Sequence, residues 1–232
     1  MTHASSRIGL RALAALCLAC LSCQTAYYGA MEKLGYEKRD ILVSRVDSAR
    51  ESQQEAKEQF EDALQQFIAV TNFSGGELEE QYNRLKGEFE ESEARAGDVR
   101  KRIDDVERVA ADLFAEWNAE LGEYANPEMR RASKRQLEST RTRCQKLIGV
   151  MNRAEKKLDP VLAAFRDRVL FLKHNLNARA VASLRGERAK VESDIGALVA
   201  DMNRSIAEAD AFIKAEHKRW GEVIRAAGIK PE

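Results

Sequence analysis

The feature that most constrains the fold is an uninterrupted repeat between Leu78 and Trp117. Apolar or small residues recur there at alternating spacings of four and three, without a slip. This period of 3.5 residues is typical of a coiled-coil seam, along which a helix buries a narrow stripe against its neighbour. The members of the stripe are Leu78, Tyr82, Leu85, Phe89, Ser92, Ala96, Val99, Ile103, Val106, Ala110, Leu113 and Trp117.

Three other segments have the same repeat. The first stripe is interrupted only by the polar Gln53, and the last one is expected to drift to an adjacent position at Ile206, Ile213, Trp220 and Ile224. The first stripe is Leu42, Val46, Ala49, Ala56, Phe60, Ala63, Phe67 and Val70. The third is Ser133, Leu137, Thr140, Cys144, Leu147, Met151, Ala154, Leu158, Val161, Phe165 and Leu172, and the last is Val191, Ile195, Leu198, Met202 and Ala209.

Two turns are predicted from glycine, proline and capping residues. Asn72–Glu77 contains a Gly pair, and Ser74 with Glu77 has the spacing of a capping box. Gly122–Pro127 forms the second turn, with Asn126 as the cap of the following helix and Pro127 as its first residue.

The remaining breaks leave alternatives. The stripe passes through Asp159-Pro160 in register, which favours a kinked continuous helix over a new helix. The third turn lies within His174–Gly186. The polar run His174–Asn177 is the favoured position and Gly186 the alternative.

Composition agrees with a helical array. Charged residues make up 33% of the 232 residues and aromatic residues 6%, and there are only 3 Pro. Short connections force neighbouring helices to run antiparallel. We therefore expect an all-α fold, an elongated antiparallel coiled-coil bundle of about four long helices. Its expected boundaries are a signal peptide at 1–22, a lipidated N-terminus and tether at 23–38, the helical domain at 39–228 and a frayed tail at 229–232.

The N-terminus predicts export. Two arginines precede an apolar run at 12–21 that is shorter than the roughly 20 residues of a membrane-spanning helix. Leu21-Ser22-Cys23 resembles the end of a bacterial lipobox, so Cys23 is the predicted acylation site. Cys20 is a competing site, and an ordinary cleaved signal is the alternative. Cys144 is the only other cysteine of the mature chain and is expected to be buried.

Several blocks resemble a bacterial lipoprotein family known as domain of unknown function (DUF) 2959. They are Cys23–Tyr28, Met31–Gly35, Lys38–Val43, Phe171–Ala178 and Ser205–Asp210. The resemblance covers nearly the whole mature chain. It implies an envelope lipoprotein with a coiled-coil body and no assigned activity.

Motifs for catalysis are missing from the sequence. There is no phosphate-binding Gly-x-x-x-x-Gly-Lys-Ser/Thr loop and no Gly-x-Gly-x-x-Gly. Neither His174 nor His217 has the Glu-x-x-His spacing of di-iron bundles. The 38 basic and 38 acidic residues balance, which gives no global electrostatic reason to bind nucleic acid or anionic lipid. We expect no enzyme activity, cofactor or metal.

One charge cluster is a candidate site. It consists of Arg130, Arg131, Lys134 and Arg135. These side chains lie near a predicted helix start, where the macrodipole disfavours positive charge. The cluster could bind an anionic group or an acidic partner. The alternative is neutralisation by Glu120, Glu123 and Glu128.

The sequence thus predicts a rod-like scaffold or adaptor. A lipid anchor would attach it to the membrane, at the periplasmic face of the outer membrane since Gln24 follows Cys23. Its partner would be an envelope protein, and a homo-oligomer is possible. The alternative is a membrane-active or curvature-shaping helical protein.

Overall fold

The computed structural model describes residues 38–75 and 77–226, with the side chains of the last helix placed as far as Arg219. The chain divides into two units between Leu42 and Val43. The packing described below is that of the second unit, taken by itself. The predicted signal, acylation site and tether at residues 1–37 lie outside the described residues, as do Trp220 and Ile224 as side chains.

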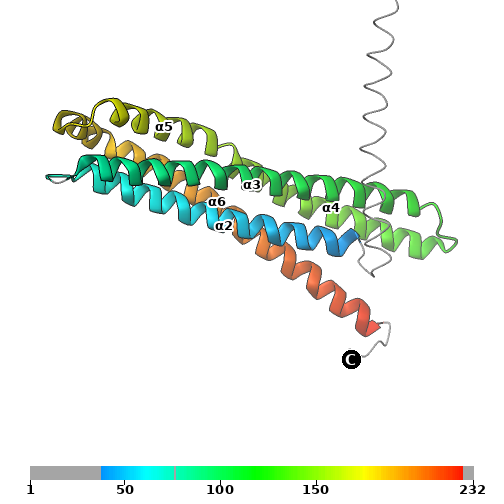
Figure 1. Ribbon diagram of the computed structural model, residues 1–232. Helices are drawn as coiled ribbons and strands as arrows, with labels where there is room; N and C mark the ends of the chain where they lie inside the picture. The colour runs from blue at the N-terminus through cyan, green and yellow to red at the C-terminus, as the bar shows by residue number, and fades with distance from the viewer. Residues whose placement is uncertain (1–37, 76, 227–232) are drawn as a thin grey trace, which may run out of the picture. The chain divides into compact units, whose positions relative to one another are not determined.

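All regular structure in the described residues is helical, which confirms the predicted all-α class (Figure 1). The helices are α2 (Lys38–Thr71), α3 (Leu78–Glu120), α4 (Pro127–Glu155), α5 (Leu158–His174) and α6 (Ala178–Ala226). None of them is long and apolar enough to cross a membrane.

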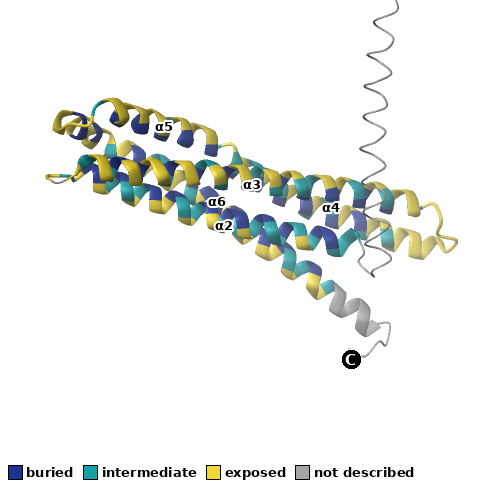
Figure 2. Cartoon of the chain, viewed as in Figure 1, coloured by how far each residue is buried: buried dark blue, intermediate teal, exposed yellow. Residues whose placement is uncertain are grey.

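The helices pack as an up-and-down bundle, in which α4 and α5 follow one another along α3 and α6 (Figure 1). Arg95 of α3 pairs with Glu55 of α2 at 2.7 Å, and Arg100 of α3 pairs with Glu155 of α4 at 3.2 Å. Arg185 of α6 reaches back to α2, where its Nε donates to the carbonyl of Thr71 at 2.9 Å. α3 and α6 therefore each contact α2, α4 and α5, and the core lies between the helices (Figure 2).

The predicted stripes form this core. From Val46 onward, their described members are buried except Leu78 and Ser133, which are partly exposed, and Ile206 and Ile213, discussed next. Phe165 of α5 packs against two aromatic rings in this core. Its ring centroid lies 5.9 Å from that of Phe67 and 6.2 Å from that of Phe89. The 3.5-residue period thus identified the buried faces of α2 to α5 and that of α6 from Val191 to Met202.

The predicted drift in α6 is wrong. Ile206 and Ile213 are only partly buried, whereas Ser205, Phe212 and Glu216 are buried at 0%, 3% and 1% exposure. These three residues continue the four-three spacing from Met202 through Ala209. The buried stripe of α6 therefore keeps its register, with the polar side chains of Ser205 and Glu216 at two of its positions.

The predicted continuous helix through Pro160 is also wrong, because the helix is interrupted one turn before the proline. α4 ends at Glu155 and α5 begins at Leu158, while Lys156 and Lys157 keep right-handed helical angles. Pro160 has no N–H for the carbonyl of Lys156, and its ring crowds that carbonyl. The stripe stays in register because the backbone never leaves the helical region.

Helix ends show which capping signals are reliable. Asn126 caps α4 as predicted, with Oδ1 accepting from the amides of Glu128 at 2.8 Å and Met129 at 3.2 Å. The capping box at Ser74 and Glu77 does not form, because Glu77 is itself the N-cap of α3 and makes no side-chain cap bond. The third turn lies at 175–177, in the favoured position, and Asn177 caps α6.

Acidic residues that precede basic ones by four positions form ion pairs on the surface of α3. Glu80 pairs with Arg84 at 2.5 Å, and Glu91 pairs with Arg95 at 2.9 Å. Asp104 and Arg108 have the same spacing but do not form an ion pair. Arg108 pairs with Asp105 instead and uses its Nε to donate to the Asp104 carbonyl at 3.3 Å.

Candidate partner-binding site

The candidate site lies at the turn between α3 and α4, at one end of the helical body (Figure 1). A buried cluster of Trp117, Leu121 and Leu137 joins the two helices just before the turn. The indole Nε1 of Trp117 also donates to Ser133 Oγ at 2.8 Å. Packing and a hydrogen bond therefore fix the two helices next to the turn. The side chains of the turn and of the start of α4, at 122–132, are exposed.

The structure brings the four predicted cations together on the first three turns of α4. Arg130, Arg131, Lys134 and Arg135 are all exposed. Lys134 has one weak contact, 3.9 Å from Glu138 on the same helix. Within the described part of the chain, no ion pair joins the three arginines to Glu123 or Glu128. These arginines are thus available to an external anion or carboxylate.

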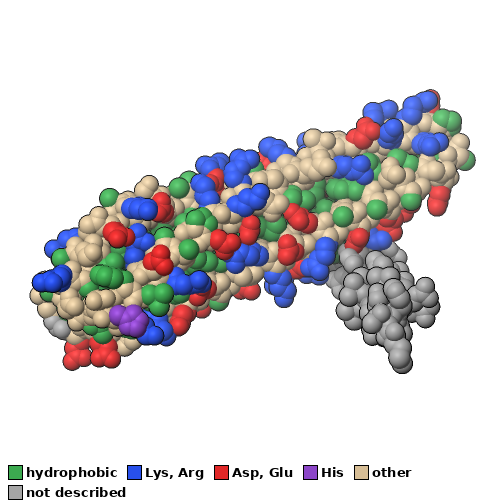
Figure 3. Space-filling view, turned by 90° about the horizontal axis from the view of Figure 1, so that it is seen from above, with side chains coloured by type: hydrophobic (Ala, Val, Ile, Leu, Met, Phe, Trp, Pro, Cys, Tyr) green, Lys and Arg blue, Asp and Glu red, His purple; other side chains and the backbone are tan. Residues whose placement is uncertain are grey.

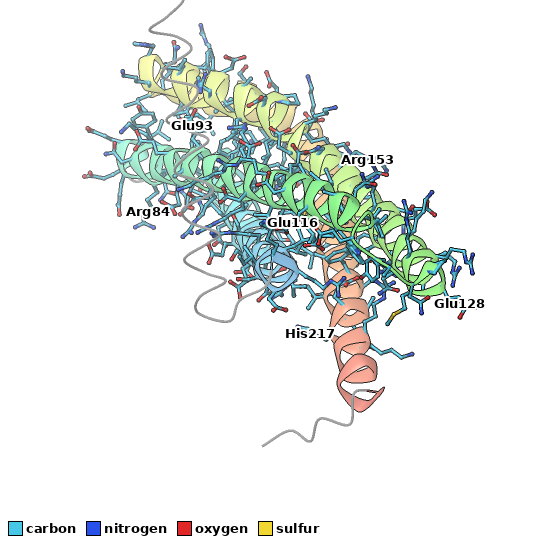
Figure 4. All side chains as sticks on the ribbon, turned by 90° about the vertical axis from the view of Figure 1, so that its right-hand side faces the viewer. Arg84, Glu93, Glu116, Glu128, Arg153 and His217 are labelled. Atoms are coloured by element: carbon cyan, nitrogen blue, oxygen red, sulfur yellow. The ribbon has the colours of Figure 1, made fainter. Side chains whose placement is uncertain are left out.

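The local field favours a negative partner. α4 carries eight basic and three acidic residues, and four of the basic ones lie at its N-terminal end. The helix macrodipole adds about half a positive charge at that end. Glu128 in the first turn offsets part of this charge and points outward at the same end (Figure 4).

Apolar side chains accompany the cations. Tyr124 in the turn and Met129 in the first turn of α4 are 40% and 60% exposed. Lys and Arg side chains gather over this end of the surface (Figure 3). Arginine, tyrosine and methionine are the residues that protein interfaces favour. We call the surface formed by Tyr124, Met129 and the four cations the basic tip.

Sequence reasoning missed a buried charge network between α4 and α6. Glu216 is 1% exposed and accepts from Arg143 at 2.8 Å, with Arg219 3.4 Å away. Arg219 also donates to the buried hydroxyl of Thr140 at 2.6 Å. The signal was present, because Glu216 follows Ala209 by one heptad.

Cys144 lies beside this network and is buried, as predicted. Burial raises the pKa of its thiol to about 12, and the negative charge of Glu216 adds to the effect. A thiol with so high a pKa is neutral and unreactive at physiological pH. Cys144 therefore acts as a small core residue.

A shallow groove between α2 and α6 is the other polar feature. Among the residues that line it are Asp47, Arg50, Asp210, Lys214, Lys218 and His217, of which His217 is labelled in Figure 4. Arg50 pairs with Asp47 at 2.8 Å and with Asp210 at 3.5 Å. The charge of Arg50 is therefore matched within the groove, in contrast to the arginines of the basic tip.

The other predicted positions fall into two groups. Cys23 and its competitor Cys20 lie outside the described residues. His174 is the exposed last residue of α5. Among the residues that the structure describes, no group of three or more His, Cys, Asp or Glu side chains is placed to hold a metal ion.

Comparison with known proteins gives a single match. A search of curated proteins and a search of solved structures each return no match. A family model described as "Protein of unknown function (DUF2959)" matches residues 27–215, which include α2–α5 and most of α6. The predicted resemblance is confirmed, and the chain belongs to the DUF2959 family.

Proposed function

We propose that the protein is a lipid-anchored scaffold or adaptor of the bacterial cell envelope, non-enzymatic, that binds a partner protein through the basic tip. The anchor is the predicted acylated Cys23. Two acyl chains suffice for stable membrane attachment. The tip is the observation that carries the proposal.

The helical body supports a scaffolding role because its seams are used internally. The apolar stripes of α2 to α6 bury one another from Val46 onward, which leaves mainly polar faces for the outside. A partner therefore has to recognise a local surface and not an open seam. The basic tip offers such a surface, since it combines exposed Tyr124 and Met129 with unpaired arginines.

The chemistry of the tip defines the partner. Guanidinium groups bind carboxylates with two parallel hydrogen bonds, and an adjacent aromatic ring or thioether adds apolar contact. The expected partner surface is therefore acidic with a small apolar centre.

In-cell photo-crosslinking tests this proposal. A photoreactive residue at Arg131 should capture one discrete envelope protein, whereas the same residue at Gln145, exposed on the same helix, should not. The double substitution Arg130→Glu/Arg135→Glu should lower capture about tenfold or more, because it reverses two charges at the contact. The matched double substitution Lys101→Glu/Lys190→Glu, on exposed positions elsewhere, should leave capture unchanged.

Equal capture at Arg131 and Gln145, or capture that survives the reversal at the tip, overturns the assignment of the tip. The anchor is tested separately with Cys23→Ser, which should move the protein to the soluble fraction. Membrane retention of that variant would count against lipidation at Cys23.

A further inference from the structure

The turn between α5 and α6, at the opposite end of the body from the basic tip, carries an exposed apolar patch (Figure 1). Leu170, Phe171 and Leu176 are 45%, 41% and 41% exposed. In the described part of the chain, only Tyr124 and Met129 are other large apolar side chains with comparable exposure. Exposed apolar groups that cluster in this way mark interaction sites more often than single ones do.

The fold presents this patch on a fixed turn. α5 buries Val169 and Leu172 in the core, so Leu170 and Phe171 face outward between them. Asn175 Nδ2 donates to the carbonyl of Phe171 at 3.0 Å. Asn177 Oδ1 accepts from the amides of Arg179 and Ala180 at 3.1 and 3.0 Å. The exposed side chains are therefore not needed for packing, and their backbone is held in place.

Along the chain, the charge beside the patch has one sign, although the α2–α3 turn at the same end carries the exposed Glu77 and Glu79. The stretch 168–186 contains Arg168, Lys173, Arg179 and Arg185 but no Asp or Glu, in a chain of zero net charge. Arg168 pairs with Glu187 at 2.6 Å, and Arg185 binds the Thr71 carbonyl. Lys173 and Arg179 are exposed and form no ion pair with any described residue.

Asp167 limits the patch on one side, about one helical turn before Leu170. The surface that remains is small. Three side chains that each expose less than half of their area fall far below the roughly 800 Å² per partner of a stable protein interface. A second copy of the chain would find too little area here, and it would bring the same positive charge.

We infer that this patch is a docking site for an anionic phospholipid surface. Leu170, Phe171 and Leu176 enter the interface between head groups and acyl chains, while Lys173 and Arg179 bind lipid phosphates. Apolar side chains beside basic ones are the combination that holds peripheral proteins at such surfaces. This inference goes beyond the proposed function, because it gives the helical body a membrane contact of its own, apart from the anchor and the partner.

Vesicle flotation tests the inference with the chain from Gln24 to Glu232, which contains every described helix and lacks the acylated cysteine. It should float with vesicles that contain phosphatidylglycerol and remain below with pure phosphatidylcholine. Replacing Leu170, Phe171 and Leu176 by Ser should lower binding about tenfold or more, since the variant loses the apolar area that enters the interface. Lys173→Glu/Arg179→Glu should lower it at least roughly twentyfold, because each basic residue contributes about fivefold.

The matched control is Tyr124→Ser/Met129→Ser, which removes exposed apolar groups at the other end and should leave flotation unchanged. Circular dichroism melting checks that each variant keeps its helices. No flotation of the parent chain, equal flotation of the Ser variant, or loss with the control variant would overturn the inference. A concentration-dependent dimer that the Ser variant abolishes would assign the patch to self-association and overturn it as well.

Discussion

Two buried polar positions on neighbouring seams are built in opposite ways. Glu216 of α6 is a charged side chain at 1% exposure, and its Oε1 has two arginines within 3.4 Å, while its Oε2 is buried without a hydrogen-bond partner. Gln53 of α2 is neutral and fully buried, and neither its amide nitrogen nor its amide oxygen has a hydrogen-bond partner. The carboxylate, which costs more to bury than an amide, is thus the group that has charged partners.

The difference teaches how this bundle tolerates polar groups in its core. Arg143 and Arg219 remain 33% and 20% exposed, so each bridges between the buried carboxylate and water. Gln53 lies among the small residues Ala49 and Ala56 of its own stripe, with no long side chain that could reach it from there. We call the first arrangement the charged layer and the second the amide layer. The charged layer should stabilise the fold and the amide layer should weaken it.

The largest expected effect is on the reactivity of Cys144, which reports on the charged layer. With the thiol pKa raised to about 12, the thiolate fraction near neutral pH should be about a thousandfold below that of an ordinary thiol. Alkylation of the native protein by iodoacetamide should be slower than in urea by at least about that factor. Fast alkylation of the native protein would mean that the layer opens readily.

The pH dependence of this site has a defined sign. The folded protein holds the Cys144 proton more tightly than the unfolded chain does, so its contribution to stability is complete below about pH 8.5. That contribution is lost as the pH rises toward 12. The stability difference between the parent and Cys144→Ala should therefore shrink in that window, as urea unfolding at several pH values can measure.

The next effect concerns Glu216 itself. Glu216→Ala leaves two arginines without their carboxylate, and we expect the free energy of unfolding to fall by about 3 kcal/mol. The exposed Glu138, replaced by Ala in the same way, should cost less than about 0.5 kcal/mol because exposed pairs contribute little. Urea denaturation followed by circular dichroism gives both values. Equal values would show that the charged layer stabilises the fold no more than an exposed carboxylate does.

The amide layer should respond in the opposite direction. Gln53→Leu removes two unsatisfied polar atoms at nearly constant volume and should raise the free energy of unfolding by about 1–2 kcal/mol. Gln145→Leu, on an exposed position of α4, is the matched control and should change it by less than about 0.5 kcal/mol. Destabilisation by Gln53→Leu would show that the amide is satisfied by water.

The smallest effect tests what Gln53 faces. Arg50 pairs with Asp210 at 3.5 Å and Lys57 donates to Asn203 at 3.4 Å, so Gln53 lies opposite the stretch of α6 that contains Ser205. The Ser205 hydroxyl is also buried without a partner. A double-mutant cycle of Gln53→Leu and Ser205→Ala should give a coupling energy of about 0.5 kcal/mol. Strict additivity would place the two side chains in separate environments.

Most of the fold could be predicted because a seam is a one-dimensional property of the sequence. The 3.5-residue period finds the buried face of a helix whatever its partners are, and Val46 to Val70 illustrate this. What failed depends on a few local bonds. The capping box at Ser74 did not form, and Pro160 broke the hydrogen-bond ladder one turn upstream.

The residues of the candidate site could be predicted from the sequence, but their ion-pair partners could not. The four cations of the basic tip are adjacent in sequence, so their gathering on one helix start needed no tertiary information. Whether Glu123 and Glu128 would pair with them did need it. Glu216 was missed because periodicity treats a carboxylate as exposed, and its two arginines come from different helices. Leu170 and Phe171 lie off the predicted stripe, which contains Leu172, and periodicity does not reveal what an exposed apolar pair can bind.

Helix α6 has a consequence for how the chain acquires its structure. The contact between Arg185 and the end of α2 joins residues separated by 114 positions, and the ion pair from Arg143 to Glu216 spans 73. Loops of that length must close before these contacts form. The apolar side chains of α2 to α5 that α6 covers therefore stay exposed to solvent until the last helix is available. A chain that crosses a membrane as a thread, as its N-terminus predicts, would complete its core only when its C-terminal quarter has emerged on the far side.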